Sequence, residues 1–351
     1  MLEGDLLRRA LLNRVAARRT GRPAKPAGAM HLFLACAIRD SEWILPPALA
    51  PFGTVTVFDW KSRGFDEFQP GWLARRDEMN REMLAEFQAA NSRQPVDAVV
   101  GYLSGRNTSP ETVRAMAAIG AVVFNFCFDD TLYFSDPVLG GRPAGPACIA
   151  SDVDLNLTST ASSLVKYAVH GGLAAFFPEA AHPDVHRPYD IPFEFDVSFV
   201  GTRYGPRGRF LESLIRREIR VACFGRGWER GPLSNEDMIR LYSRSRINLG
   251  ISGIGQSLKL MHLKGRDFEV PMAGGLYLTQ DNPELNLVYD VGAEILAYHD
   301  AEDCARTIRK LIADPDLAAG IRAAGRARAL RDHTYQTRWG NVFRLAALLT
   351  D

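Results

Sequence analysis

The sequence lacks the features that mark several common classes of protein. Only 5 of its 351 residues are cysteine and no CxxC pair occurs, so neither a zinc site nor a disulfide framework is indicated. No apolar run reaches the ~18 residues that a membrane-spanning helix needs. The net charge of +1 argues against bulk electrostatic binding to nucleic acid. These absences favour a cytoplasmic protein with reduced thiols.

Two motifs of nucleotide-dependent enzymes are also missing or misplaced. The first expected strand, 31–37, runs into CAIRDSEW with no GxGxxG, so a dinucleotide-dependent dehydrogenase is poorly supported. The Asp-Val-Asp at 152–154 has the spelling of a metal-binding DxD, but it lies at the start of an expected strand. We interpret it as a polar strand edge and predict no metal site.

The N-terminus differs in charge from the rest of the chain. Residues 1–28 hold seven basic and two acidic side chains, and LLRRALLNRVAARR places apolar residues at helical spacing. The absence of an uninterrupted apolar core excludes a signal peptide. We predict a basic amphipathic leader and linker over 1–28. It either packs on the neighbouring domain or makes peripheral contact with an anionic membrane face.

Length and rhythm predict two α/β domains. A chain of 351 residues exceeds the ~250–300 at which one core stops growing. From residue 30, apolar strands alternate with helical stretches, a pattern typical of parallel sheets with helices on both faces. A proline-rich break then precedes a second series. The predicted parts are an N-terminal domain, a linker, a C-terminal domain and a last helix, at 29–178, 179–194, 195–333 and 334–351.

Three expected strands of the second domain end in glycine-rich turns: GTRYGPR, GRGW and SGIGQS. Backbone N–H groups in such turns, together with the N-terminus of the following helix, can hold an anion. The accompanying arginines strengthen this interpretation. The anion-binding candidates in these turns are Gly201, Arg203, Arg207, Gly225 and Arg226.

The stretch LKGRDFEVPMAGG adds a second set of candidates. Lys264 and Arg266 lie at the start of an expected short helix, where the helix dipole also favours an anion such as a diphosphate. Glu269, one turn on, could accept hydrogen bonds from the vicinal hydroxyls of a ribose. Gly274 and Gly275 would end the helix and allow close backbone approach. The alternative is a helix with a solvated charged face.

Several of these segments, in order, resemble the CgeB-like glycosyltransferases, which carry a "glycosyl transferases group 1" domain. They are DVSFVGTRYGPR, FGRGW, LSNEDMIRLYSRSRINLGISG, LKGRDFEVPMAGGLYLT and DHTY, and the resemblance covers most of 95–337. It implies a GT-B fold, with two Rossmann-like domains facing a central cleft and the C-terminal helix crossing back to the first. It also implies that the second domain binds the donor, with Lys264 and Arg266 on the diphosphate and Glu269 on the ribose. Met261 stands where many retaining members have a further Glu, which leaves the stereochemistry open.

The resemblance implies a glycosyltransferase that moves a sugar from a nucleotide-diphosphate sugar, UDP- or GDP-linked, to a hydroxyl of a glycan, lipid or protein. No separate cofactor, metal or nucleic acid is expected. By position, Asp129 and Asp130 are the candidates for a general base, with helix capping as the alternative. Asp40 has positional support only. Two other functions stay open: another GT-B enzyme such as a nucleotide-sugar epimerase, and a non-catalytic sugar-nucleotide- or glycan-binding component of a surface-assembly system.

Overall fold

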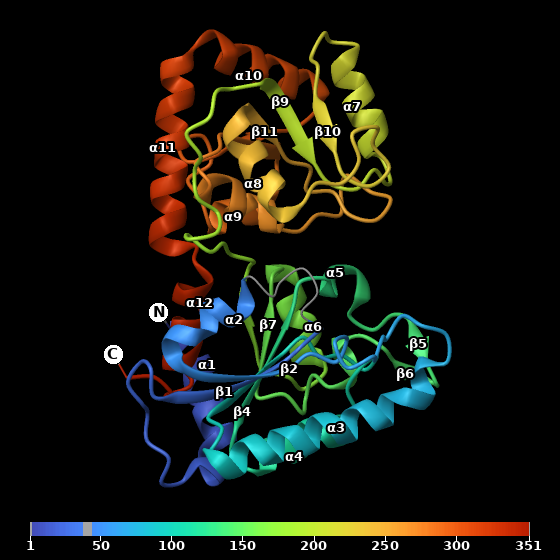
Figure 1. Cartoon of the computed structure of the whole chain (residues 1–351), viewed down its shortest axis with the longest axis vertical. Helices are drawn as coiled ribbons and strands as arrows, with labels where there is room; N and C mark the ends of the chain where they lie inside the picture. The colour runs from blue at the N-terminus through green and yellow to red at the C-terminus, as the bar shows by residue number, and fades with distance from the viewer. Residues whose placement is uncertain (1, 38–43, 351) are drawn as a thin grey trace. The chain divides into compact units, whose positions relative to one another are not determined.

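The structure, a computed structural model, describes residues 2–37 and 44–350; Asp40 lies outside them. The chain forms two compact units (Figure 1). Unit 1 comprises Met1–Pro178 and Gln336–Asp351, and unit 2 comprises Glu179–Tyr335. Each unit is built around one parallel sheet, which confirms the prediction of two Rossmann-like α/β domains.

The sheet of unit 1 has six parallel strands in the order β2-β1-β3-β4-β7-β8. Its central strands are buried on both faces, as expected for parallel strands that helices cover on both sides. A two-stranded antiparallel hairpin lies apart from this sheet. The strands are β1 Met30–Ala35, β2 Gly53–Phe58, β3 Ala98–Gly101, β4 Val122–Cys127, β5 Val138–Leu139, β6 Arg142–Pro143, β7 Leu155–Thr158 and β8 Ala174–Phe176.

Helices cover both faces of this sheet. Phe87 of α3 packs edge-on against Phe33, with ring centroids 5.4 Å apart. Trp339 of α12, which is fully buried, packs against Phe126 of β4. Register and side-chain alternation place Phe33 and Phe126 on opposite faces. The helices of unit 1 are α1 Leu2–Val15, α2 Leu45–Leu49, α3 Trp72–Arg93, α4 Pro110–Ala118, α5 Asp130–Tyr133, α6 Leu164–Val169 and α12 Tyr335–Leu345.

The basic leader is docked on unit 1. Its apolar Leu11 and Val15 are buried. Arg19 and Arg22 donate to main-chain carbonyls beside the C-terminal end of α4, where cations are favoured. Further leader cations bind the amino edge of the sheet, in Lys25–Asp97 and Arg18–Asp154 ion pairs. No helix among the described residues combines the length and apolar character needed to cross a bilayer.

Unit 2 has a five-stranded parallel sheet in the order β10-β9-β11-β12-β13. Its strands are β9 Phe195–Val200, β10 Ala222–Phe224, β11 Ser245–Leu249, β12 Tyr277–Gln280 and β13 Leu296–Tyr298. In chain order this is 2-1-3-4-5, a doubly wound sheet whose direction of progression reverses between β9 and β11. Ligands of such sheets bind beyond the carboxyl ends of the strands at this reversal.

A side-chain cap starts α8 of unit 2. Ser234 Oγ accepts from the N–H of Asp237 there, and the pair of residues three positions apart is a capping signal in the sequence. The amphipathic α10 buries Ile308 and Leu311 against the sheet, and α11 adds Ala318 and Ile321 to the same core. The helices are α7 Arg207–Ile215, α8 Asn235–Arg244, α9 Gly265–Met272, α10 Ala301–Ala313 and α11 Pro315–Asp332.

Candidate functional site

Two guanidinium groups meet at the reversal point of the unit 2 sheet. Arg207 is the first residue of α7, which follows β9, and Arg266 lies in the first turn of α9, which follows β11 after the segment 250–264. Their Cζ atoms lie 5.8 Å and 6.0 Å from the ring centroid of Phe199, which is fully buried in β9. The structure therefore brings these two predicted residues to one place.

Lys264 joins them as the residue that caps α9. Its N–H donates to Oδ2 of the buried Asp267 at 2.7 Å, and the hydroxyl of Tyr277 donates to Oδ1 of the same carboxylate at 2.7 Å. Burial and the charges of Arg266 and Arg207 lower the pKa of Lys264 to about 7. The side chain of Lys264 is thus held close to two cations, although burial and their charges favour its neutral form.

This concentration of positive charge is only partly neutralised within the protein. Burial and the charge of Arg266 lower the pKa of Arg207 to about 10. Burial also disfavours the Arg266 cation, but the surrounding tyrosines and carboxylates raise its pKa above the usual value. The Nε atoms of Arg207 and Arg266 are buried and have no hydrogen-bond partner within the part of the chain that the structure describes. Their N–H groups, the ammonium of Lys264 and the N-terminus of α9 fit an anion with several oxygens, such as a diphosphate.

The Glu269 carboxylate lies one turn further along α9 and remains partly accessible, with 17% of its side chain exposed. The hydroxyl of Tyr242 donates to its Oε2 at 3.3 Å, and Nε2 of the buried His186 lies 4.0 Å from its Oε1. Burial lowers the pKa of His186. Glu269 is therefore held in place beside the cations and retains acceptor capacity for a ligand hydroxyl.

Glycine at position 265 allows two carboxylates to approach the start of α9. A Cβ added there would lie 2.8 Å from Oε2 of Glu179 and 2.8 Å from Oε1 of Glu269. Glu179 also favours the charged form of Lys264. Carboxylates and cations therefore alternate around this helix terminus, which suits a ligand that carries both phosphate and hydroxyl groups.

Other predicted residues lie elsewhere. Arg203 is half exposed and lines a small pocket between α7 and β10. Its guanidinium pairs with Glu212 at 3.4 Å and lies 5.1 Å from the ring centroid of Trp228. Arg226 is exposed in the loop after β10, and its carbonyl accepts from the N–H of Arg203. The structure therefore selects Arg207, not Arg203 or Arg226, as the partner of Arg266.

Gly201 and Gly225 allow two loops to approach each other. A Cβ on Gly225 would lie 2.5 Å from the carbonyl oxygen of Gly201, and Gly225 has a φ of +123°. The two glycines bring the turns after β9 and β10 into contact, a packing role that sequence alone did not separate from anion binding.

The predicted role of Gly274 and Gly275 at the ligand is not supported by their position. Both follow the C-terminal end of α9, whereas Lys264 and Arg266 are at its N-terminal end. Gly274 has a φ of +73° and ends the helix. A Cβ on Gly275 would lie 2.7 Å from Nδ2 of Asn248 and 2.8 Å from Cγ1 of Val270, so this glycine lets the helix end pack against β11.

In unit 1 the structure separates the two candidate bases. Asp129 is exposed after β4, and its Oδ2 accepts from the hydroxyl of Tyr102 at 3.0 Å. Asp130 is fully buried and its Oδ2 accepts from the hydroxyl of Tyr167 at 2.9 Å; burial raises its pKa. Asp130 therefore has a structural role, and Asp129 alone can reach a ligand.

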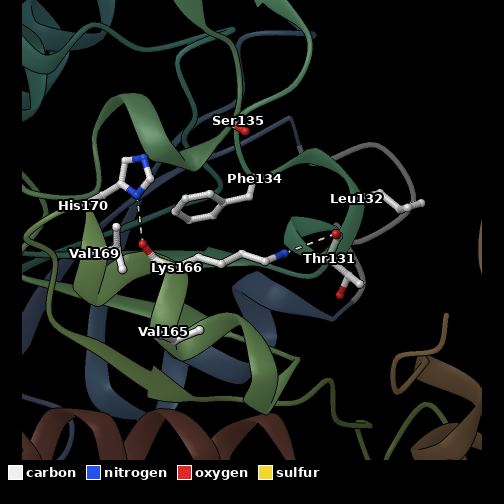
Figure 2. Close-up of a pocket in the computed structure, with 8 residues that line it drawn as sticks. All are labelled: Thr131, Leu132, Phe134, Ser135, Val165, Lys166, Val169 and His170. Atoms are coloured by element: carbon white, nitrogen blue, oxygen red, sulfur yellow. Dashed lines mark hydrogen bonds between the residues drawn. The ribbon is translucent and has the colours of Figure 1, made fainter.

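Helix α5 contributes to two pockets. One, of about 420 Å³, contains Lys166 and His170, and none of the described residues that line it is acidic (Figure 2). Nζ of Lys166 donates to the carbonyls of Asp130 and Thr131, and the His170 ring contacts Phe134. The other, of about 390 Å³, contains Asp129 and opens at the carboxyl ends of β3 and β4. Only the second offers a carboxylate base.

Sequence reasoning missed the residues that support the charged cluster. Asp267 stands between Arg266 and Glu269 in the stretch considered, and its position three residues after Lys264 is a capping signal that could have been used. Tyr277 and Tyr242 are on a strand and another helix, and His186 lies in the segment predicted as a linker. No local pattern connects these positions to α9.

Among the described residues, no group of three or more His, Cys, Asp or Glu side chains is arranged to hold a metal ion. Residues 207–344, which include Arg207, Lys264, Arg266 and Glu269, match the model of a family described as glycosyl transferase-like. No curated protein matches the chain in sequence.

Solved structures similar to this one share the GT-B fold. Anabaena HepE in complex with UDP and glucose is 12% identical, with a TM-score of 0.60 over 90% of this chain and 98% of that one. A glycosyltransferase from Rickettsia africae is 11% identical, with a TM-score of 0.58 over 91% and 98%. A structure titled a UDP-N-acetylglucosamine 2-epimerase, from Listeria monocytogenes, is 13% identical, with a TM-score of 0.50 over 87% and 95%.

Proposed function

We propose that the chain is a glycosyltransferase that transfers a sugar from a nucleotide-diphosphate sugar, UDP- or GDP-linked, to an acceptor hydroxyl. The observation that carries this proposal is the cluster of Arg207, Lys264 and Arg266 at the reversal point of the unit 2 sheet. The match of residues 207–344 to a glycosyl transferase-like family supports it. The HepE complex with UDP and glucose lends support from a shared fold. Kinship with CgeB-like members is part of the same proposal.

The cluster would act on the leaving group. As the bond between the anomeric carbon and the diphosphate breaks, negative charge grows on the diphosphate oxygens. Arg207, Lys264 and Arg266 would stabilise that charge by preorganised, partly desolvated contacts. We propose that these cations make a metal ion unnecessary for leaving-group departure.

Glu269 would bind the ribose. Its accessible carboxylate can accept from the 2′- and 3′-hydroxyls, and Tyr242 limits its rotation. Asp129, held by Tyr102, would take the proton of the attacking acceptor hydroxyl. Whether transfer inverts or retains the anomeric configuration depends on the face from which that hydroxyl attacks.

A titration with UDP, GDP, dTDP, ADP and CDP tests nucleotide binding. A ligand at a hundredfold excess over its Kd stabilises the native state by ~2.7 kcal/mol, which a thermal-shift assay detects. Lys264→Ala and Arg266→Ala should each weaken binding about tenfold to a hundredfold, because a charge-assisted hydrogen bond contributes ~1.5–3 kcal/mol. Lys310→Ala, at an exposed site on α10, is the matched control. Equal binding by all variants would show that the cluster does not hold the diphosphate.

The ribose assignment has its own test. If Glu269 binds the 2′-hydroxyl, wild type should prefer UDP to 2′-deoxy-UDP, and Glu269→Gln should reduce that preference. A preference unchanged in the variant would contradict the role. Glu302→Gln, exposed on α10, serves as the control.

Product analysis separates the alternatives. Slow hydrolysis of the bound donor, and transfer once an acceptor is present, are expected of a transferase. Conversion of the sugar without an acceptor would favour the epimerase alternative. Tight nucleotide-sugar binding with neither reaction would favour the non-catalytic binding component.

A further inference from the structure

The pocket that contains Asp129 is built mainly from the segments that follow strands at the carboxyl edge of the unit 1 sheet. Glu67 and Phe68 follow β2, Tyr102 and Arg106 follow β3, and Asp129 follows β4. Its volume of about 390 Å³ is at the lower end of the ~300–1,000 Å³ typical of ligand pockets. It would therefore hold the reacting end of a ligand rather than an extended chain.

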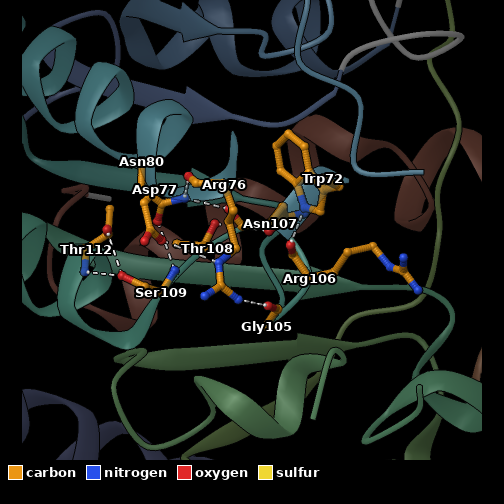
Figure 3. A network of polar contacts seen from close by, with 10 residues as sticks. All are labelled: Trp72, Arg76, Asp77, Asn80, Gly105, Arg106, Asn107, Thr108, Ser109 and Thr112. Carbon is orange, nitrogen blue, oxygen red and sulfur yellow. Dashed lines mark hydrogen bonds and ion pairs between the residues drawn. The ribbon is translucent and has the colours of Figure 1, made fainter. Parts of the chain in front are cut away.

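The floor of this pocket is fixed before any ligand arrives. The side chains of α3 hold the loop after β3: Trp72 Nε1 donates to the carbonyl of Arg106 at 2.6 Å, and Arg76 Nη1 to that of Gly105 at 3.0 Å (Figure 3). The buried Asn80 donates to the carbonyl of Asn107 and accepts from the N–H of Ser109. A loop held at so many points is suited to binding a rigid ligand with little reorganisation.

The charges in the pocket are mainly negative. Of the described residues that line it, Glu67, Asp129 and Asp136 are acidic and Arg106 is basic. That cation is already engaged: its Nη1 donates to the carbonyl of Glu67 at 3.3 Å, and its Cζ lies 5.2 Å from the Phe68 ring centroid. A ligand group with a negative charge would be repelled here, whereas hydroxyl groups would find acceptors.

Aromatic rings complete the lining. Phe68 is 68% exposed and Tyr133 54% exposed, so both rings are accessible to a ligand. The negative face of an aromatic ring attracts weakly positive C–H groups. Carboxylates that accept from hydroxyls and rings that accept C–H groups together match the two faces of a sugar ring.

We infer that this pocket binds an uncharged sugar ring as the acceptor end of the substrate, so that the chain glycosylates a neutral glycan or glycoside and not a phosphorylated or carboxylated acceptor. This inference rests on the proposed function, because a sugar bound in this pocket is an acceptor only if the chain is a glycosyltransferase. Binding of the sugar ring itself can be measured without any nucleotide.

The test uses pairs of ligands that differ only in charge. Methyl glycosides of glucose, galactose, mannose and N-acetylglucosamine are titrated against full-length protein by saturation-transfer NMR, and methyl glucuronide is compared with methyl glucoside. We expect at least one glycoside to bind, and the glucuronide to bind at least about fivefold more weakly than the glucoside. Asp136→Asn should reduce that discrimination.

Two phenylalanines give a matched control. Phe68→Ala should weaken glycoside binding by about threefold to tenfold. Phe193→Ala should have no effect. Phe193 is exposed and lies beside two cations, as Phe68 does beside Arg106 and Lys61, but it is in unit 2. An equal effect of both variants would show that the pocket is not where the sugar binds.

The outcomes separate this inference from the proposed function. UDP binding without binding of any glycoside, or glucuronide binding as tight as that of glucoside, overturns the inference and leaves the nucleotide site intact. Glycoside binding that Phe68→Ala weakens, without binding of any nucleotide, supports the sugar pocket and contradicts the transferase. Lys264→Ala should leave glycoside binding unchanged.

Discussion

At the residue scale, the buried charge of Lys264 lowers the stability of the native protein but should favour the binding of an anionic ligand. Its pKa is lowered to about 7 because the ammonium is buried beside Arg266 and Arg207. Between about pH 7 and the pKa of a free lysine near 10.4, the unfolded chain binds a proton that the native protein does not. Stability attributable to this group therefore rises with pH across that window and is lowest below pH 7.

We expect Lys264→Met to stabilise the protein in the absence of ligand, most strongly at pH 6 and progressively less towards pH 10. The same substitution should weaken UDP binding. Denaturant midpoints across pH measure the first effect and calorimetry the second, with Lys310→Met as the control. A uniform gain at all pH values would contradict the proposed electrostatic cause.

Binding of UDP by wild type should also be linked to proton uptake. A diphosphate placed beside Lys264 favours its charged form, so the protein takes up a proton near pH 7.5. Affinity should fall as the pH rises from 6 to 9. Calorimetric titrations in buffers with different ionisation enthalpies count the proton, and Lys264→Met should abolish the uptake. Proton uptake that persists in the variant would assign it to another group.

Asp129 and Asp130 are adjacent in sequence but should behave oppositely on substitution. Asp129→Ala should abolish transfer with stability changed by less than ~0.5 kcal/mol, because the side chain is exposed. Asp130→Ala should lower stability by ~1–3 kcal/mol, because the buried hydroxyl of Tyr167 loses its acceptor. Initial rates and chemical denaturation measure the two effects. Normal turnover by Asp129→Ala would remove it as the base.

At the element scale, α9 places the charged cluster. The first turn is held by Asp267, which binds the N–H of Lys264 and the hydroxyl of Tyr277 from β12. The helix is therefore anchored to the neighbouring strand at the same point where it presents its cations. A comparable cap at the start of α8, Ser234 with Asp237, is exposed, and its hydrogen bonds are made within α8 and its capping residue.

We expect Asp267→Ala to lower stability by ~2–4 kcal/mol, from loss of the cap and of a buried partner for Tyr277. UDP affinity should fall with it, because Lys264 is no longer fixed. Asp237→Ala should lower stability by only ~0.5–1 kcal/mol and leave UDP binding unchanged. Equal losses of stability in the two variants would show that the link to β12 contributes little.

Sequence predicted the two α/β domains, whereas the grouping of the candidate site residues depends on the fold. Strands such as β1 and β4 are recognisable in the sequence because parallel strands buried on both faces are continuous apolar runs, and Ser109 and Ser234 mark the starts of α4 and α8 by local hydrogen bonds. The grouping of Arg207 with Arg266 depends on strand order, since β9 and β11 are neighbours only in the folded sheet. Burial distinguished Asp129 from Asp130, and no local pattern encodes burial.

At the scale of the whole molecule, the leader belongs to the first unit. Arg19 is buried and donates to the carbonyls of Asp97 and Gly120, which lie 78 and 101 positions further along the chain. Together with Lys25 and Arg18 it ties the leader to the amino edge of the sheet. Most of the basic side chains predicted for the leader thus bind groups within unit 1.

We expect deletion of residues 1–28 to lower the thermal midpoint of unit 1 while leaving UDP binding by unit 2 intact. Arg19→Ala should produce part of the effect, ~1–3 kcal/mol, because two buried carbonyls lose a partner. Arg8→Ala, exposed on α1, should not. Calorimetry that resolves two transitions is the measurement. If the deletion left the unfolding transition of unit 1 unchanged and abolished partition onto anionic vesicles, the membrane interpretation of the leader would be favoured.

The return of Gln336–Asp351 to unit 1 has a consequence for synthesis on the ribosome. Trp339 and Phe343 complete a core whose other members, Phe124 and Phe126, are translated more than two hundred codons earlier. Unit 2 is an uninterrupted segment and can fold as soon as it emerges. The domain that is translated first is therefore finished last, and a nonsense codon after position 335 would spare unit 2 and leave unit 1 without its final helix.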